Sequence, residues 1–186
     1  MLSVIIPTLD SERLLVPTLA ALVSGATEGL IREVLLADGG SQDDTALVAD
    51  VAGCKCLKLD RALGQRLRAA AAAARGPWLL LLRPGIILDP PWIGETRRFI
   101  ELTGDSERAA VFRRGSAAPS PLRDALVQAL AALGARPRPE QGLLIARRFY
   151  DALGGHRADA AEPERELIRR IGRKRIARLG AIAHAA

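Results

Sequence analysis

Short apolar runs alternate with segments of helical spacing through the first 83 residues. The first run ends at Pro7 and the second at Asp38. Runs of this kind are typical of buried parallel strands, and leucines three or four residues apart indicate one face of a helix. This alternation predicts an α/β fold whose parallel sheet is wound by right-handed crossovers. The predicted strands are residues 2–7, 33–38, 55–59 and 78–82, and the predicted helices are residues 14–25, 46–52 and 64–74.

Prolines break up the second half of the chain, which begins after Arg83. A late helix is predicted from Glu162, because Leu167, Ile168 and Ile171 fall on one face. A surface loop is predicted at residues 113–120. Further helices are predicted at residues 92–102 and 122–133, and further strands at residues 109–112, 142–146 and 174–179.

The length and composition suit one compact unit. A chain of 186 residues that is 49% apolar can bury one sizeable core. We therefore expect a single domain, residues 1–186, made of two halves, residues 1–83 and 84–186.

The turn after the second predicted strand carries the clearest functional signal. Asp38 is followed by two glycines and then by Ser41, Asp43, Asp44 and Thr45. Nucleotides usually bind at the carboxyl end of a strand in an open α/β sheet, because the backbone comes close and the helix start offers unpaired N–H groups. On this interpretation Asp38 faces a ligand and not the core. The alternative is an ordinary turn in which Asp43 or Asp44 caps the helix.

The positive charge favours an anionic partner. The net charge is +6 and the pI is near 10.3. Aromatic residues make up only 3% of the chain, so stacking platforms for nucleic-acid bases are scarce. A nucleotide diphosphate fits the charge as well as a larger polyanion does. We therefore expect no nucleic-acid partner.

Cys54 and Cys56 lie two residues apart in a predicted strand, too close in sequence to form a disulfide comfortably. We expect two free thiols and a reducing compartment. His156 and His184 lie far from both, which argues against a structural zinc site. The sequence shows no cleavage signal and no uncharged run that would span a bilayer, so we expect a cytoplasmic protein with no more than peripheral membrane contact.

Several segments together resemble family 2 glycosyltransferases in their order and spacing. The first is the opening strand with Pro7, Thr8 and Asp10, and the second is the turn around Asp38. The resemblance covers almost the whole chain and is closest to the compact bacterial rSAM/selenodomain-associated transferases. The other matching segments are residues 71–82, 140–148, 153–155 and 163–170.

The resemblance implies a GT-A fold, a nucleotide-binding α/β sandwich with a mostly parallel central sheet and helices on both faces. It implies transfer of a sugar from a nucleotide-diphosphate sugar to an acceptor, with residues 1–83 on the nucleotide side and residues 84–186 on the acceptor side. In this role Asp38 would accept a hydrogen bond from the base, and Gly39 would give the ring room. A polar loop cap is the alternative role for Thr8 and Asp10. The residues implied to bind the nucleotide are Pro7, Thr8, Asp10, Glu12, Asp38, Gly39 and Arg83.

The family's metal-binding position is altered in this chain. Where the family has an Asp-containing motif after the fourth strand, this chain has Leu82-Arg83-Pro84-Gly85. Mg²⁺ or Mn²⁺ on a donor diphosphate needs hard oxygen ligands, so we expect no metal site here. Asp89 is too far along the chain to substitute and is expected to cap the following helix.

Arg83 could neutralise the diphosphate directly, because its forked donors suit phosphate oxygens. There are two alternatives. The domain could have kept its fold and lost its chemistry, or Arg83 could simply extend its charge into solvent.

Glu164 is the candidate general base. Family members that invert the anomeric carbon place a Glu-Asp pair before the late helix, and Pro163-Glu164 matches that position. A carboxylate there could take the proton of the acceptor hydroxyl during attack. The alternative is structural, because acidic residues are favoured in the first turn of a helix by its dipole.

Three hypotheses for the function remain open. The chain is a glycosyltransferase with little or no need for metal, a catalytically silent binder of nucleotides or nucleotide sugars, or a basic protein that binds a larger polyanion. A cleft with Asp38 and Arg83 at its mouth favours the first two, and arginines clustered on one face favour the third. No motif identifies the acceptor, the donor sugar or the oligomeric state.

Overall fold

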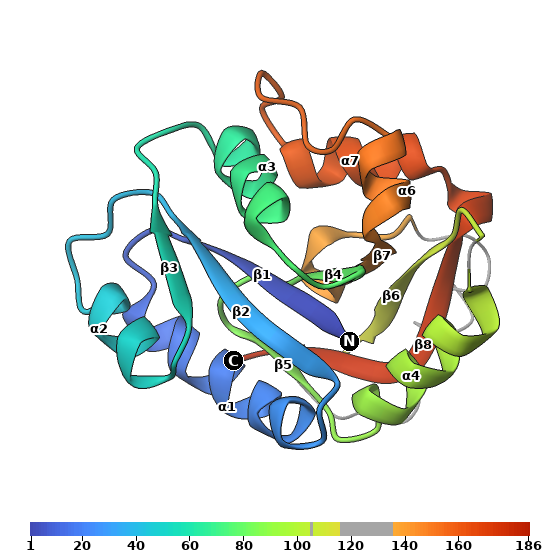
Figure 1. Ribbon diagram of the computed structural model, residues 1–186, viewed down its shortest axis with the longest axis horizontal. Coiled ribbons are helices and arrows are strands. Elements are labelled where there is room, and N and C mark those ends of the chain that lie inside the picture. Colours follow the sequence, from blue (N-terminus) through green and yellow to red (C-terminus); the bar gives the residue numbers. More distant parts are fainter. Residues whose placement is uncertain (105, 116–135) are drawn as a thin grey trace.

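The computed structural model describes residues 1–104, 106–115 and 136–186. The strands are β1 Leu2–Thr8, β2 Ile31–Asp38, β3 Lys55–Lys58, β4 Trp78–Leu81, β5 Ile86–Leu88, β6 Ala109–Arg114, β7 Leu143–Ala146 and β8 Ile176–Ala185. The helices are α1 Glu12–Thr27, α2 Thr45–Val51, α3 Leu63–Ala73, α4 Trp92–Thr103, α6 Arg147–Ala152 and α7 Pro163–Ile171. Two 3-10 turns are η1 Pro139–Gln141 and η2 Arg173–Arg175. These strands form one sheet in the order β3-β2-β1-β4-β7-β6-β8-β5 (Figure 1).

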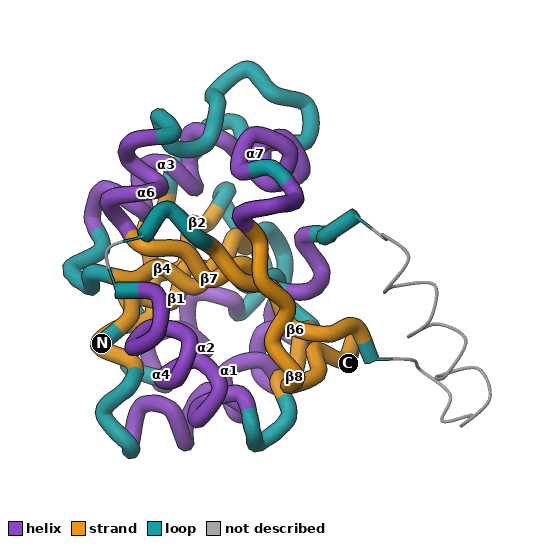
Figure 2. The backbone as a smooth tube through the Cα atoms, turned by 90° about the vertical axis from the view of Figure 1, so that its right-hand side faces the viewer, coloured by secondary structure: helices purple, strands orange, loops and turns teal. Residues whose placement is uncertain are grey.

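The first four strands form the parallel part of the sheet that the pattern predicts. β1 lies between β2 and β4, and β3 pairs with the outer side of β2, all in the same direction. The helices α3, α6 and α7 cover one face, and α1, α2 and α4 cover the other (Figures 1 and 2). The predicted α/β fold with helices on both faces is confirmed.

The second half adds strands in mixed directions. β7 pairs antiparallel with both β4 and β6, and β6 runs parallel to β8. β5 pairs antiparallel with β8 at the far edge of the sheet. The sheet is therefore parallel where β1 to β4 lie together and mixed beyond β4.

The structure corrects several boundaries in this half. Arg113 and Arg114 belong to β6 and not to a loop, because both pair with β8. The last strand begins at Ile176 and runs to Ala185, well past the predicted end. The short elements β5 and α6 have no counterpart in the pattern. The predicted helix at residues 122–133 and residues 116–120 of the predicted loop lie outside the described residues.

Cys54 and Cys56 are free thiols, as predicted. Both are partly buried and pack against the hydrophobic core. Burial raises the pKa of Cys54 to about 11, with a smaller contribution from Cys56, so the thiol stays protonated at neutral pH.

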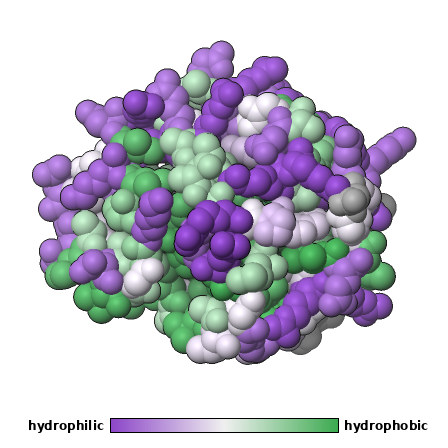
Figure 3. Space-filling view, viewed as in Figure 1, coloured by the Kyte–Doolittle hydropathy of each residue, from purple (hydrophilic) through white to green (hydrophobic). Residues whose placement is uncertain are grey.

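The surface mixes polar and apolar residues. On the face drawn in Figure 3, hydrophilic residues line the upper rim, over α3 and α7. Across the described ranges, the structure has no helix that is both long and apolar enough to cross a membrane.

A close contact between α1 and α4 depends on a glycine. Trp92 of α4 is fully buried, and its ring lies against Gly25 of α1. A Cβ at Gly25 would lie 2.5 Å from the ring, closer than packed atoms allow. The absence of a side chain at Gly25 therefore lets the two helices cover the same face of the sheet.

Replacing Gly25 by alanine is expected to lower the free energy of unfolding by about 1–3 kcal/mol, because the added methyl group must displace Trp92 within a packed core. Gly94→Ala in α4 is the matched control. A Cβ there meets no described atom within 4 Å, so the better helix propensity of alanine should add about 0.4–1 kcal/mol. Urea unfolding measures both changes. Equal stability of the two variants would contradict this packing.

Candidate functional site

The carboxyl ends of the parallel strands lie along one edge of the sheet. β2 lies on one side of β1 and the later β4 on the other, so the strand order reverses between β1 and β4. Open α/β sheets bind ligands in the crevice at such a reversal. The loops that follow Thr8 and Asp38, and the segment that follows Leu81, leave the sheet at this edge.

Asp38 is buried, with 1% of its surface exposed. Its Oδ1 accepts hydrogen bonds from the hydroxyls of Thr8 (2.9 Å) and Ser41 (2.5 Å). Its Oδ2 accepts hydrogen bonds from the backbone N–H groups of Gly40 and Ser41, both at 3.0 Å. The acceptor positions of the carboxylate are therefore filled from within the protein. A base could bind Asp38 only by replacing one of these bonds.

The charge of Asp38 is set by two opposing effects. Burial alone would raise the pKa of the carboxyl group, but the hydrogen bonds from Ser41, Thr8 and Gly40 outweigh it and lower the pKa below its ordinary value of 3.8. Asp38 is therefore ionised at neutral pH and holds the turn closed.

Arg66 is a buried cation beneath this turn that the sequence analysis does not single out. Its Nη1 donates to the carbonyls of Thr8 (2.7 Å) and Ala37 (2.9 Å). A Cβ at Gly39 would lie 2.5 Å from the same nitrogen, so the glycine makes room for Arg66. In the sequence Leu67 is flanked by Arg66 and Arg68, and only the structure shows that Arg66 lies on the buried face of α3 while Arg68 is exposed.

The loops after β1 and β2 are tied together. Asp10 accepts a hydrogen bond from the N–H of Gln42 (2.7 Å), and its own N–H donates to Ser41 Oγ (2.9 Å). The N–H of Glu12 donates to Asp43 (2.9 Å). Asp10 is exposed and has a φ of 46°, a left-handed conformation that few residues other than glycine adopt. The predicted pocket residues that this edge brings together are Thr8, Asp10, Glu12, Asp38 and Gly39, and Pro7 lies next to them at the end of β1.

The helix start beyond this turn relies on Asp43. Its Oδ1 accepts hydrogen bonds from the N–H (3.0 Å) and the hydroxyl (2.5 Å) of Thr45, the first residue of α2. Asp44 occupies the N-cap position but makes no capping bond with its side chain. Of the two carboxylates that the sequence offers, Asp43 supports the helix.

Arg83 follows β4 and joins two glutamates from the second half of the chain. Its Nε and Nη2 donate to the carboxylate of Glu164, the shortest bond being 2.5 Å, and its Nη1 donates to Glu140 at 3.1 Å. The Glu164 side chain is 10% exposed and the Arg83 side chain 37%. The predicted cation and the predicted base thus form one ion pair, which Glu140, absent from the prediction, extends.

The hydrogen bonds to Glu164 raise the pKa of Arg83, against the opposing effect of burial, and the charges of Glu164 and Glu140 add to the rise. The guanidinium is therefore a permanent cation at the end of β4. The guanidinium already binds two negatively charged carboxylates. Any anionic ligand that approaches it therefore has to compete with Glu164 and Glu140.

The residues at the end of β4 do not fit a divalent metal. The guanidinium of Arg83 stands where hard oxygen ligands would be needed. Among the described residues, no three or more His, Cys, Asp or Glu side chains gather closely enough to hold a metal ion. Asp89 accepts a hydrogen bond from the N–H of Ile182 (2.7 Å) and does not cap α4, which begins without a side-chain cap. The capping expectation for Asp89 is wrong, because β8 takes its carboxylate.

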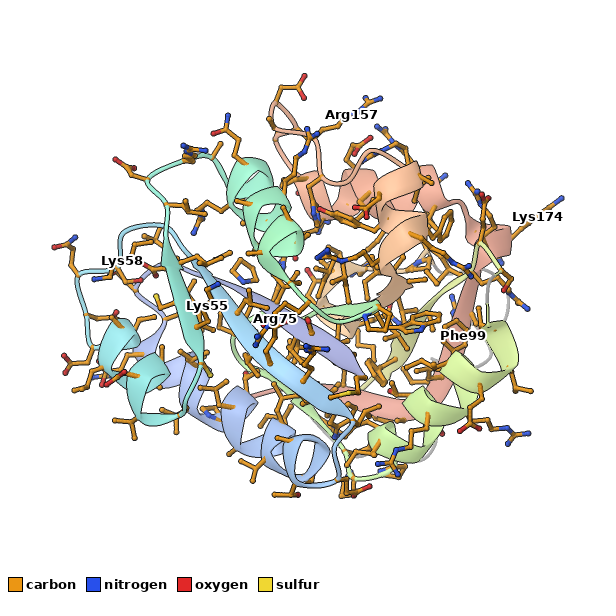
Figure 4. All side chains as sticks on the ribbon, in the orientation of Figure 1. Lys55, Lys58, Arg75, Phe99, Arg157 and Lys174 are labelled. Carbon is orange, nitrogen blue, oxygen red and sulfur yellow. The ribbon has the colours of Figure 1, made fainter. Side chains whose placement is uncertain are left out.

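A groove of about 1080 Å³ lies along the outer side of α7, and neither Asp38 nor Arg83 lines it. Arginines from four segments of the chain form much of its lining. Arg157 projects beside the start of α7 and Lys174 lies beyond its other end (Figure 4). A cluster of arginines, the feature expected to favour binding of a larger polyanion, is therefore present on this side of the molecule.

A family model, Glycosyl transferase family 2, matches residues 3–116 of the chain. Among curated proteins, none matches the chain.

Solved structures match over the whole chain. Glucosyl-3-phosphoglycerate synthase from Mycobacterium tuberculosis, with Mn²⁺, UDP and glucosyl-3-phosphoglycerate, gives a TM-score of 0.71 at 20% identity, covering 100% of this chain and 72% of that one. The same synthase with Mn²⁺ and UDP-glucose gives 0.71 at 20% identity, covering 100% and 71%. Residues 1–349 of TarS from S. aureus give 0.73 at 16% identity, covering 100% and 60%. At these identities the likeness concerns the fold alone, and it confirms the predicted GT-A fold.

Asp38→Asn is expected to lower the free energy of unfolding at pH 7 by about 1–3 kcal/mol, because the amide removes a charged acceptor and leaves buried donors unpaired. Folding lowers the pKa of Asp38, so its contribution is present at neutral pH and is lost as the pH falls below about 4, through the folded pKa. Urea unfolding of wild type and variant between pH 7 and pH 3 measures this.

The exposed Asp44, which makes no capping bond, provides the control Asp44→Asn. We expect that variant to match the wild type at every pH. A stability loss at Asp38 that stays the same at pH 3 would show that its charge does not hold the turn.

Proposed function

Because the chain belongs to glycosyl transferase family 2, we propose that it transfers a sugar from a nucleotide-diphosphate sugar to an acceptor hydroxyl. The observation that carries this proposal is the position of Thr8, Asp38 and Arg83 at the reversal of strand order, where α/β sheets bind nucleotides. The synthase structures with UDP and UDP-glucose support a uridine nucleotide as the first donor to test.

The nucleoside lies against the loops after β1 and β2. Asp38 holds the second of these loops through its bonds within the turn, and a base N–H reaches Asp38 by replacing the Ser41 hydroxyl. Asp10 is exposed beside it. Arg66, which forms no ion pair among the described residues, adds positive charge beneath the same edge.

The donor diphosphate binds Arg83, without a divalent metal. A diphosphate offers more negative charge than one carboxylate, and it competes for the guanidinium that Glu164 and Glu140 hold. When Arg83 turns to the diphosphate, Glu164 loses its partner. Donor binding therefore frees Glu164 to act as the base. The donor must bind before the acceptor can react.

Glu164 then takes the proton of the acceptor hydroxyl. The hydroxyl oxygen forms a bond to the anomeric carbon as the bond from that carbon to the diphosphate breaks, and the nucleoside diphosphate leaves with its electron pair. Glu164 lies in the first turn of α7, where it contacts Arg83 at the end of β4.

A catalytically silent nucleotide binder is the second candidate function, and the same cluster favours it. Arg83 and Glu164 neutralise each other, as they would in an ion pair that only fastens the end of β4 to α7. Measured turnover separates the two candidates.

The first test compares nucleoside diphosphates with their nucleosides by titration calorimetry in the presence of chelator. We expect the wild type to bind the diphosphate, UDP first, about tenfold or more tightly than uridine, because charge-assisted bonds to Arg83 add to the base contacts. Arg83→Gln should remove most of that difference. Arg32→Gln, at an exposed arginine at the start of β2, is the control and should leave it unchanged. Equal binding of diphosphate and nucleoside by the wild type would contradict the proposed role of Arg83.

The second test measures donor hydrolysis or transfer by Glu164→Gln. This variant is expected to bind the diphosphate at least as tightly as the wild type, because the neutral amide competes less for Arg83. It is expected to lose roughly 10²-fold or more in rate, since positioned proton transfer contributes on that scale. Glu101→Gln on the exposed side of α4 is the control. Normal turnover by Glu164→Gln would leave this residue only its place in the helix start. No turnover by the wild type with any donor would favour the silent binder.

A further inference from the structure

The groove along α7 has an apolar floor and a basic rim. Ile168 and Ile176 provide apolar lining between α7 and the start of β8. The arginines that line it come from the segment before η1, the loop before α7, α7 itself and η2. They are Arg136, Arg138, Arg157, Arg165, Arg169 and Arg173.

The positive charge of this lining is only partly neutralised. Three carboxylates, from Asp159, Glu162 and Glu166, share the groove with six arginines. Glu162 pairs with Arg165 at 3.0 Å. Glu166 is bound by Arg170 at 2.7 Å, with Arg157 at 3.7 Å. The remaining arginines are therefore the ones open to a ligand.

Within the described part of the chain, four of the lining arginines form no ion pair, and they are Arg136, Arg138, Arg169 and Arg173. All four are exposed. Like charges that line one groove repel one another. An oxyanion that binds among them relieves the repulsion and accepts charge-assisted hydrogen bonds. The chemistry of the rim therefore fits a phosphate or carboxylate group.

The groove adjoins the candidate base. Ile168 lines both the groove and a small cavity whose wall includes Glu164 and Pro139. Arg138 directly precedes η1, the turn that carries Glu140. α7 thus presents Glu164 to Arg83 on its buried side and Arg165 and Arg169 to the groove on its outer side.

We propose that this groove binds the acceptor and that the acceptor is a small molecule with a phosphate or carboxylate group, an assignment that rests on the proposed function. The anionic group binds at Arg138, Arg169 and Arg173. The rest of the molecule packs on the apolar floor at Ile168, which also borders the small cavity lined by Glu164. The groove therefore selects the acceptor class, and the strand edge selects the donor.

The test uses three probes that share one carbon skeleton: glycerol 3-phosphate, glyceric acid and glycerol. Each is titrated into the full chain by calorimetry at 0.15 M salt, about the strength at which distant surface charges are screened. UDP and a ten-nucleotide thymidine oligomer are titrated in parallel. The groove variant is Arg169→Gln with Arg173→Gln. Its control, Arg32→Gln with Arg98→Gln, removes two exposed arginines from β2 and α4.

We expect one or both anionic probes to bind more tightly than glycerol, and the groove variant to weaken that binding about tenfold or more. The control variant should bind like the wild type, and UDP affinity should be the same in all three proteins. A shared thermal midpoint in the three proteins shows that the groove variant is folded, and these exposed substitutions leave the core intact.

Other results would overturn the assignment. Equal binding of glycerol and the anionic probes would remove the anion site. If the groove variant and the control variant lost the same amount of anion affinity, the binding would be due to the overall positive charge of the protein and not to the groove. Tighter binding of the oligomer than of glycerol 3-phosphate, lost in the groove variant, would assign the groove to polyanions. Anion binding in a chain that binds no nucleoside diphosphate would overturn the acceptor role and the proposed function, while retaining the anion site.

Discussion

The ion pairs of Arg83 join the two halves of the molecule. β4 is fully buried between β1 on its parallel side and β7 on its antiparallel side, so the chain that leaves it emerges at a fixed point of the sheet edge. Arg83 stands at that point and binds Glu164 of α7 and Glu140 of η1. A ligand that draws Arg83 away from these carboxylates must therefore alter the contacts of both α7 and η1.

The turn after β2, at the same edge of the sheet, is held by many hydrogen bonds. Asp38 gathers Thr8, Gly40 and Ser41 around one carboxylate, and Arg66 fixes the carbonyls below them. These hydrogen bonds form in the absence of any ligand. A nucleotide that binds here would therefore lose little free energy to ordering the loop. As a consequence, Asp38 has no free acceptor position. A nucleotide base can therefore bind Asp38 directly only by breaking one of these hydrogen bonds, which the sequence does not indicate.

Much of the fold could be predicted from the sequence, because the first four strands and three helices obey simple periodicities over enough residues to be distinct. The second half offered less. β5 spans three residues after a Pro-Gly pair, and α6 spans six, too short for either period to be recognised. β8 extends beyond its predicted end because it pairs with β5 and β6 over its last residues. The alternation of apolar and polar residues in that stretch is too weak to identify a strand.

The candidate site divides in the same way. Thr8 and Asp38 could be found because each ends a clear strand. Arg66 and Glu140 could not, because their roles arise from contacts between residues 29 to 58 positions apart in the chain. The same holds for the pairing of Arg83 with Glu164, which are 81 positions apart. The sequence predicted a function for each residue separately. Only the structure shows that the two form an ion pair, so that neither is free to bind a ligand while the pair is intact.

The most direct test of this account is the ¹⁵N NMR signal of the Arg83 Nε–H group, assigned by its loss in Arg83→Gln. The account predicts that adding UDP in chelator shifts this signal, because Arg83 exchanges Glu164 for the diphosphate, while the Nε–H signals of arginines far from the edge stay in place. Binding of UDP with no change in the Arg83 signal would contradict it, because Arg83 would then keep its carboxylates and take no part in holding the donor.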